Sequence, residues 1–374
     1  MLKGTACAPA PIAIYLSSDG EFLSRANRAR NVWYHHHYLN GVRPALFERF
    51  KGRIEWLDDA DVLAGRLKQY RMVLCPIFQA TTDQLLAKLR EYQAAGGTIV
   101  GDDLWQVSGL IPNDTFPGRD VDAYQVPYAN EHLRRWHQAN RTAILAWQPR
   151  GLPPDTELFA IDTASADAIP ALREVGGVRY AVVANCRFRR GEFAERHRFV
   201  NEDYLDQGVA QETDLTVAAP AQSAVYDVVS SRRLDPEEYA VLGDRVRLRV
   251  KLPPAGGALY AFHPQLVAAV VADPGTTAPV APGTLVNLAV TVRGADGAPV
   301  PGHTVVALNV IDAQGQVQEV SGHHVVRGGA AGIPFGIPLG AAPGAWSVAV
   351  TDLTSGLTSQ AGLTVAALPG QAGD

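Results

Sequence analysis

The chain has 374 residues, more than one ordinary hydrophobic core accommodates, so two or three domains are expected. Apolar residues make up 47% and charged residues 19%, as in globular proteins, and the net charge of −5 offers no basic face for nucleic acid or anionic lipid. No apolar run reaches the roughly 18 residues of a membrane span, so no membrane-crossing segment is predicted.

The three cysteines, Cys7, Cys75 and Cys186, lie far apart and form neither a CxxC motif nor a Cys/His ligand set. Neither a disulfide framework nor a metal site is therefore predicted, and the absence of GxGxxG and GxxxxGKS motifs predicts no cofactor. No signal peptide is recognisable, which predicts a cytoplasmic protein for the chain as it stands and an exported one if it belongs to a larger precursor.

The first hundred residues alternate short apolar runs with helical patterns, which is typical of a parallel sheet with crossover helices. A Thr-Thr-Asp capping signal and an Ala-Ala-Gly-Gly stop delimit the helix at 83–93, so this helix and its two flanking strands form the clearest right-handed βαβ unit. The predicted strands are 11–18, 54–57, 71–77 and 98–103, and the predicted helices are 21–40, a segment starting at Pro44, 58–67 and 83–93.

Beyond residue 104 the pattern loosens into an insertion with a helical piece at 130–141, a candidate strand at 142–148 and a linker at 150–157. From residue 158 onward the helical period disappears and short β-type runs alternate with Pro, Gly and Asp, which predicts antiparallel sandwiches. The Asx-Gly-type turns at 294–297 and 312–315 are expected to close hairpins. The expected strands are 177–186, 213–219, 223–229, 244–252 and 257–263, and the segments 285–302, 304–316 and 345–356 repeat this strand-and-turn pattern in the last module.

The segment QYRMVLCPIFQATTDQLLAKLREYQAAGGTIVGDD (69–103) resembles the class I glutamine amidotransferase-like trimerisation domain of family 42 β-galactosidases. The shared features are a strand entered from Tyr70, Pro76 after the strand, a helix at 83–93, and the turn Ala95 to Gly97 into Thr98 to Val100. In that family the domain is not catalytic, and the resemblance implies oligomer contacts and a wall of the neighbouring barrel's active site.

Two later parts of the chain carry further resemblances. GGVRYAVVANC (176–186), AVYDVVSSRRL (224–234) and LPPAGGALYAFHP (252–264) are similar to the C-terminal β-domain of such hydrolases. VPGHTVVALNVIDAQG (300–315) and PGAWSVAVTDLTSG (343–356) look like an MG2-type macroglobulin or bacterial Ig-like domain.

These observations together predict an α/β plus all-β fold with three domains. A flavodoxin-like, class I amidotransferase-like open parallel sheet is expected at 1–150, followed by Ig-like β-sandwiches at 151–264 and 265–368 and a disordered tail at 369–374.

The catalytic barrel that family 42 enzymes carry first needs roughly 250 residues. Only ten residues precede the first predicted strand here, so the chain is interpreted as the C-terminal part of a larger or split gene product or as a free-standing accessory protein. The leading hypothesis is a non-catalytic accessory and oligomerisation region of a β-galactosidase-like glycoside hydrolase system. Its expected partners are copies of itself or a catalytic barrel subunit or domain, with carbohydrate as a possible ligand.

Two alternatives remain open. One is a stand-alone carbohydrate-binding protein, and the other is an unusual glycoside hydrolase in which Asp102 or Asp103 acts as acid or base. Both use the carboxyl ends of the predicted strands, where ligands bind in open α/β sheets. Paired carboxylates beside an aromatic ring suit sugar hydroxyls and sugar faces. The candidate ligand-binding residues are Asp102, Asp103, Trp105, Phe78, Gln79 and Asp19, with Ser17 at the same edge.

Other conspicuous residues favour structural interpretations. Cys75 follows a buried strand, roughly where an amidotransferase carries its nucleophile, but no glycine flanks it, so a buried core thiol is predicted. His35, His36 and His37 point about 100° apart on a helix and predict a histidine surface rather than a metal site. The mixed charges at 187–203 predict a solvated hairpin face or a salt-bridged subunit contact.

Overall fold

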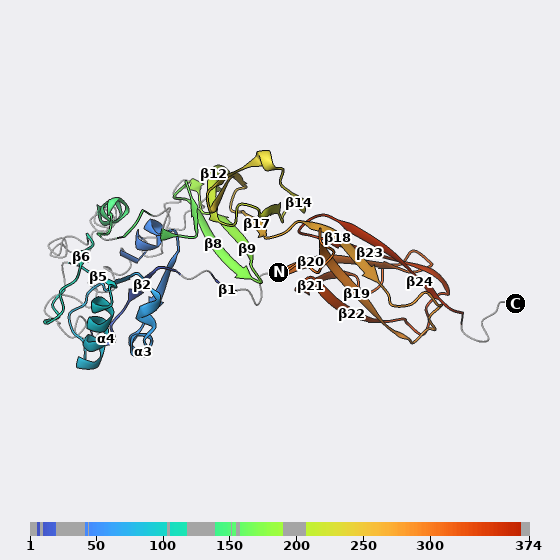
Figure 1. Ribbon diagram of the computed structural model, residues 1–374, viewed down its shortest axis with the longest axis horizontal. Helices are drawn as coiled ribbons and strands as arrows, with labels where there is room; N and C mark the ends of the chain where they lie inside the picture. Colours follow the sequence, from blue (N-terminus) through green and yellow to red (C-terminus); the bar gives the residue numbers. More distant parts are fainter. Residues whose placement is uncertain are drawn as a thin grey trace, which may run out of the picture. The chain divides into compact units, whose positions relative to one another are not determined.

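The computed structural model consists mostly of β-sheets with few helices (Figure 1). It describes residues 6–7, 10–19, 42–43, 45–102, 105–117, 139–150, 152–154, 158–189 and 207–367. The predicted helix at 21–40, His35 to His37, Asp103, most of the helix at 130–141 and of the charged segment 187–203, and the tail lie outside the described residues.

Two compact units make up the chain. One contains Pro9–Asp162 and Ala166–Pro170, and the other contains Met1–Ala8, Thr163–Ser165 and Ala171–Asp374. The predicted domain boundaries near residues 150 and 264 stay predictions. Within the described residues, no helix is long and apolar enough to cross a membrane.

The first unit contains the predicted parallel sheet. Its strand order places the first strand inside, between the second and the third, which is one of the common orders of doubly wound sheets. The strands, in the order β3-β2-β4-β5-β6, are β3 (Ile54–Leu57), β2 (Ile12–Tyr15), β4 (Met72–Leu74), β5 (Thr98–Gly101) and β6 (Asp114–Thr115).

Both faces of this sheet are buried because side chains alternate between two cores. In β2, Ile12 and Ile14 join the core that contains residues 42–50 and Ile144, whereas Ala13 and Tyr15 join the core under the helices. Figure 1 shows α3 and α4 side by side over the second face. These helical elements are α3 (Asp59–Leu63), η2 (Arg66–Gln69) and α4 (Asp83–Ala94).

Local chemistry explains where the helices begin. The Thr82 side chain accepts a hydrogen bond from the Leu85 N–H, as the capping signal predicts. Asp58 and Asp61 form a reciprocal capping box at the start of α3. The connection from β2 to β3 moves one way along the sheet and covers one face. The connections from β3 to β4 and from β4 to β5 move the other way and cover the opposite face, as right-handed connections require.

The interpretation of 142–148 as a returning strand is wrong. Residues 139–146 are helical, and Ile144 is the one fully buried position between 142 and 148. A strand of a sheet covered on both faces would bury side chains on both faces, whereas a helix lying on its surface needs only one apolar stripe. The run of apolar residues at 142–148 therefore did not distinguish a strand from a helix.

The second unit consists mainly of antiparallel sheets. A six-stranded sheet has the order β1 (Ala6–Cys7), β8 (Ala168–Val175), β9 (Val178–Asn185), β17 (Gly257–His263), β13 (Ala224–Asp227) and β14 (Arg232–Arg233). A four-stranded sheet has the order β15 (Tyr239–Leu242), β16 (Arg245–Leu252), β12 (Gln211–Ala218) and β7 (Ile161–Thr163). The short pieces are β10 (Phe188–Arg189), β11 (Gln207–Gly208) and η4 (Pro236–Glu238).

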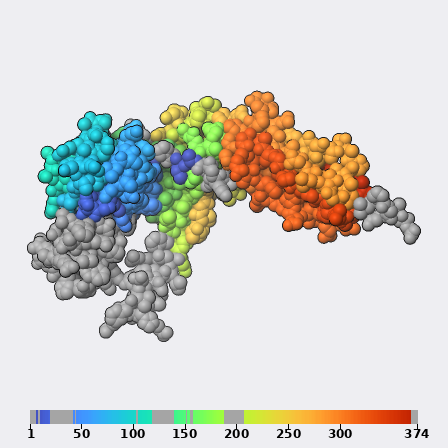
Figure 2. Space-filling model, turned by 90° about the horizontal axis from the view of Figure 1, so that it is seen from below, coloured from blue at the N-terminus to red at the C-terminus, as the bar shows by residue number. Residues whose placement is uncertain are grey.

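A seven-stranded sheet forms the C-terminal part of this unit, and its residues, in orange and red, pack into a continuous body (Figure 2). Its first and last strands approach each other, so the sheet nearly closes into a barrel. The predicted turns at 294–297 and 312–315 both close local antiparallel bridges. The order is β18 (Val267–Asp273), β19 (Leu285–Gly294), β22 (Ala330–Gly336), β21 (Gly322–Arg327), β20 (His303–Ile311), β23 (Gly344–Asp352) and β24 (Thr358–Val365).

Candidate functional site

The carboxyl ends of β2, β4 and β5 lie next to one another, and the loops that leave them are tied together. Ser17 follows β2 and donates from its hydroxyl to the Ala80 carbonyl in the loop after β4, over 3.2 Å. The Gln106 N–H, in the loop after β5, donates to the Phe78 carbonyl over 3.1 Å. These hydrogen bonds between loops thus hold together the sheet edge at which the sequence predicted a ligand site.

Two of the predicted aromatic residues pack on each other at this edge. The rings of Phe78 and Trp105 lie 4.9 Å apart between centroids, and Phe78 also contacts Tyr15 at 5.7 Å. Phe78 is buried, whereas Trp105 is half-buried. The Trp105 indole N–H donates to the carbonyls of Val107 and Leu110, at 3.2 Å each, so its polar edge is used within its own loop.

The Trp105 ring also rests on the end of β5. A Cβ added at Gly101 would come within 2.6 Å of a Trp105 ring carbon, so only glycine permits this approach. Part of the ring remains exposed.

Asp102 points into the protein. Its carboxylate accepts a hydrogen bond from the Ile77 N–H at 2.8 Å, and the residue is only 3% exposed. Ile77 has φ of +53°, a left-handed conformation that is strained for a β-branched residue. The hydrogen bond that Asp102 accepts therefore stabilises a turn that the β-branched side chain of Ile77 disfavours.

Cys75 is a buried core thiol, as predicted. It is 0% exposed, and burial raises the pKa of its thiol far above the usual range, with the nearby Asp102 carboxylate adding to the rise. The left-handed position of the turn after β4 belongs to Ile77, two residues further along. The strained position is therefore occupied by a residue that carries no nucleophile.

Asp59 is a site residue that sequence reasoning missed. Its carboxylate accepts a hydrogen bond from the Tyr15 hydroxyl at 2.6 Å and another from the Ser18 N–H at 3.3 Å. Burial of the Tyr15 phenol, reinforced by this bond, raises its pKa above the usual value. Asp59 follows β3 at the same edge of the sheet. Its position just after a predicted strand could have indicated a site residue, but the acidic residues around it were interpreted only as a helix N-terminus.

The remaining predicted residues are less constrained. Asp19 and Gln79 are half-buried at the same edge, and Asp103 lies outside the described residues. No group of three or more His, Cys, Asp or Glu side chains suited to a metal ion occurs in the described ranges. Of the charged segment at 187–203, Arg187 is described, and its N–H donates to the Asn185 side chain at 3.0 Å. Ligand binding by the predicted residues stays a prediction.

Comparisons with known proteins give similarity to solved structures alone: no family model and no curated protein matches the chain. The α-L-fucosidase isoenzyme 2 from Paenibacillus thiaminolyticus is 11% identical over 70% of this chain and 49% of its own, with a TM-score of 0.40. A GH42 β-galactosidase from G. stearothermophilus is 11% identical over 68% and 40%, with a TM-score of 0.37. The cold-adapted β-galactosidase from Rahnella sp. R3 is 14% identical over 69% and 41%, with a TM-score of 0.38.

This chain therefore spans less than half the length of each of these structures. At these identities and TM-scores the similarity is a partial resemblance in fold to glycoside hydrolases, among them GH42 β-galactosidases.

Proposed function

We propose that this chain is a non-catalytic accessory and oligomerisation region of a β-galactosidase-like glycoside hydrolase system, and that it supports carbohydrate processing. The observation that carries the proposal is the turn after β4. There the thiol of Cys75 is buried and Ile77 occupies the strained position, held by the Asp102 carboxylate.

This turn is poorly suited to nucleophilic chemistry. A nucleophile needs an accessible side chain and a base within hydrogen-bond reach, and the reactive form of cysteine is the thiolate. Burial disfavours the thiolate of Cys75. A negative charge on Asp102 disfavours it further, because two negative groups would share one buried space.

Glycoside hydrolysis by Asp102 is also disfavoured. The reaction uses two carboxyl groups on either side of the scissile bond, roughly 5 to 10 Å apart, and both must reach the sugar. Asp102 is only 3% exposed and bonded to the Ile77 N–H, so a substrate would have to displace a structural hydrogen bond to reach it.

The scaffold is consistent with the accessory role. The strand order of the parallel sheet is the flavodoxin-like order, and the segment 69–103 resembles the amidotransferase-like trimerisation domain. In the proposal this α/β region assembles subunits or covers a sugar site of a catalytic barrel, and the Ig-like regions at 151–264 and 265–368 act as spacers.

The test combines mass measurement with an activity assay on the full chain. Sedimentation equilibrium over a range of concentrations is expected to give an oligomer, and chromogenic galactosides are expected to remain uncleaved. A monomer that cleaves galactosides, and that loses this activity in Asp102→Asn or Asp103→Asn, would establish the hydrolase alternative instead.

A second function, stand-alone carbohydrate binding, is favoured by the half-buried Trp105 ring, which packs at a tilt against Phe78. Aromatic faces next to polar groups bind sugar rings. Titration of the full chain with galactosides, and of Trp105→Ala as the variant, tests it. Binding that weakens in the variant supports this function, and no binding by the unaltered chain excludes galactosides as its ligand.

A further inference from the structure

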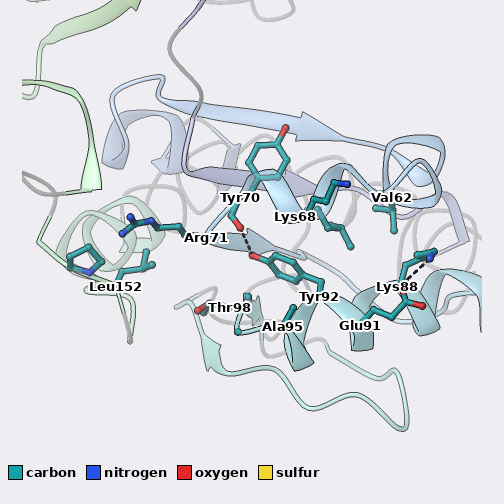
Figure 3. Close-up of a pocket in the computed structure, with 15 residues that line it drawn as sticks. Val62, Lys68, Tyr70, Arg71, Lys88, Glu91, Tyr92, Ala95, Thr98 and Leu152 are labelled. Atoms are coloured by element: carbon teal, nitrogen blue, oxygen red, sulfur yellow. Dashed lines mark hydrogen bonds and ion pairs between the residues drawn. The ribbon is translucent and has the colours of Figure 1, made fainter. Parts of the chain in front are cut away.

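A pocket lies at the opposite, amino-terminal edge of the parallel sheet. Its volume is about 570 Å³, and small-molecule sites in proteins occupy roughly 300 to 1,000 Å³. η2, the amino ends of β4 and β5, the last turns of α4 and the segment at 152–153 form its walls (Figure 3). None of the residues predicted from the sequence to bind a ligand lines this pocket.

The side chains around this pocket are mainly cationic. Lys68, Arg71 and Lys88 line it, and Glu91 is the one carboxylate among the lining residues, paired with Lys88 at 2.9 Å. Lys68 and Arg71 are exposed and have no carboxylate partner among the described residues. Nearby Arg66 does not line the pocket, and it pairs with two carboxylates, Glu55 at 3.2 Å and Asp61 at 2.7 Å, so that group carries one net negative charge against the two unpaired cations of the lining.

Helix ends account for only part of this charge. α4 ends at Ala94, beside the pocket, and a helix C-terminus carries about half a negative charge, which favours a cation nearby. The five-residue α3 contributes less. Two unpaired cations therefore exceed what the helix ends balance, so the pocket keeps a positive field that favours an anionic ligand.

The arrangement of the cations restricts the shape of that ligand. Figure 3 shows Arg71 and Leu152 on one side of the Tyr92 ring, and Lys68 and Lys88 on the other. An elongated ligand that carries negative groups at separate points matches both ends of the pocket.

The middle of the pocket offers polar groups and bare backbone. The Tyr92 hydroxyl donates to the Tyr70 carbonyl at 3.2 Å, and the Thr98 side chain lies beside it in Figure 3. At Gly65 and Gly96 the Cβ position has nothing within 4 Å, so backbone faces open space. Sugar hydroxyls both donate and accept, and they suit such a surface better than an apolar ligand does.

We propose that this pocket binds an anionic oligosaccharide whose sulfate or carboxylate groups lie on separate sugar rings. Arg71 holds one negative group through its planar guanidinium, and Lys68 holds another as a point charge. The binding does not depend on the accessory role proposed above, because neither oligomer formation nor activity enters it.

Calorimetric titration of the full chain tests the proposal with four probes. Trigalacturonate and a disulfated disaccharide are the two anionic sugars, a neutral trisaccharide is the uncharged control, and triglutamate is the peptide control. At least one anionic sugar is expected to bind more tightly than the neutral sugar and triglutamate. Its affinity should fall as salt rises from about 0.01 to 0.15 M, since the screening length shrinks from roughly 30 to 8 Å.

The variant Lys68→Gln/Arg71→Gln removes both unpaired cations, and each loss is expected to weaken binding about tenfold. Arg247→Gln removes an exposed arginine of β16 in the other unit, and it should leave the affinity unchanged. Ala95→Trp fills the pocket from an exposed position and should abolish binding without removing a charge.

Three results would overturn the proposal. One is that neither anionic sugar binds the unaltered chain. Another is that the double variant and Ala95→Trp bind the anionic sugar with the same affinity as the unaltered chain. The third is triglutamate binding as tightly as the sugars, which would make this a site for acidic peptides.

Discussion

The carboxylate of Asp102 accepts a hydrogen bond from the backbone N–H of Ile77, with 2.8 Å between the oxygen and the nitrogen. Twenty-five residues separate the two in sequence, and the bond joins the loop after β5 to the strained turn after β4. Asp102 therefore has a structural task at the edge where a ligand-binding carboxylate was predicted.

The first prediction concerns this bond. Asp102→Ala leaves the buried Ile77 N–H without its acceptor and is expected to destabilise the fold by about 1 to 3 kcal/mol. Asp102→Asn keeps an acceptor oxygen and should cost less, about 1 kcal/mol. Urea unfolding curves measure both values. Equal stability of Asp102→Ala and the unaltered chain would contradict the structural role.

A second prediction follows from His263, a buried residue whose ring contacts the ring of Tyr226. Neither ring nitrogen has a hydrogen-bond partner among the described residues. Burial lowers the pKa of His263 to about 4, against a small opposite effect of the Asp352 carboxylate. Because the unfolded chain binds the proton first, stability should fall as pH drops from about 6.5 towards 4, by roughly 3 kcal/mol in total.

Unfolding free energies of the unaltered chain and of His263→Phe, measured between pH 7 and pH 4, isolate the contribution of His263. The variant lacks the titrating group, so its stability should fall less over this range. His323→Gln on β21 serves as the matched control, because His323 is exposed. Parallel pH profiles for His263→Phe and the unaltered chain would show that the pKa of His263 is the same in the folded and unfolded states, which would contradict the prediction.

A third prediction concerns Arg53, which contacts residues 159–162 within the first unit. Its guanidinium lies 3.0 Å from the Asp162 carboxylate, donates to the Ile161 carbonyl at 2.6 Å and stacks over the Phe159 ring at 3.6 Å. Lys51 reaches the same carboxylate at 3.0 Å through its flexible ammonium group.

Arg53→Met is expected to destabilise the protein by about 3 kcal/mol or more, since a partly buried charge pair, the hydrogen bond to the Ile161 carbonyl and the contact with the Phe159 ring are lost together. Arg53→Lys should recover little of this, because lysine has no planar group to stack on Phe159. Lys51→Met should cost less, about 1 kcal/mol. Thermal and urea unfolding rank the three variants, and the opposite order would refute the assignment.

The fold of the parallel sheet was largely readable from the sequence, for reasons visible in single strands. β2, β4 and β5 are short and apolar on both faces, and the capping residue Thr82 marks the start of α4. Continuous apolar runs with caps between them leave few arrangements other than a covered parallel sheet.

The candidate site was harder to predict from the sequence because it depends on the direction in which each side chain points. The sequence located Asp102 at the correct sheet edge but did not reveal that its carboxylate points inward to Ile77. Which way a side chain leaves the end of a strand depends on the register and on the facing loop, and neither is local information. The same limit hid the bond between Tyr15 and Asp59, which joins the end of β2 to the start of α3, 44 residues further along the chain.

The account depends most on the turn after β4 being inert, and alkylation of the native protein by iodoacetamide tests this directly. Cys7 and Cys186 are exposed and serve as internal references, whereas Cys75 is fully buried. Mass spectrometry of the peptides is expected to show the two reference thiols modified at pH 8 and Cys75 modified only after denaturant is added. Modification of Cys75 in the folded protein as fast as that of the references would contradict the account.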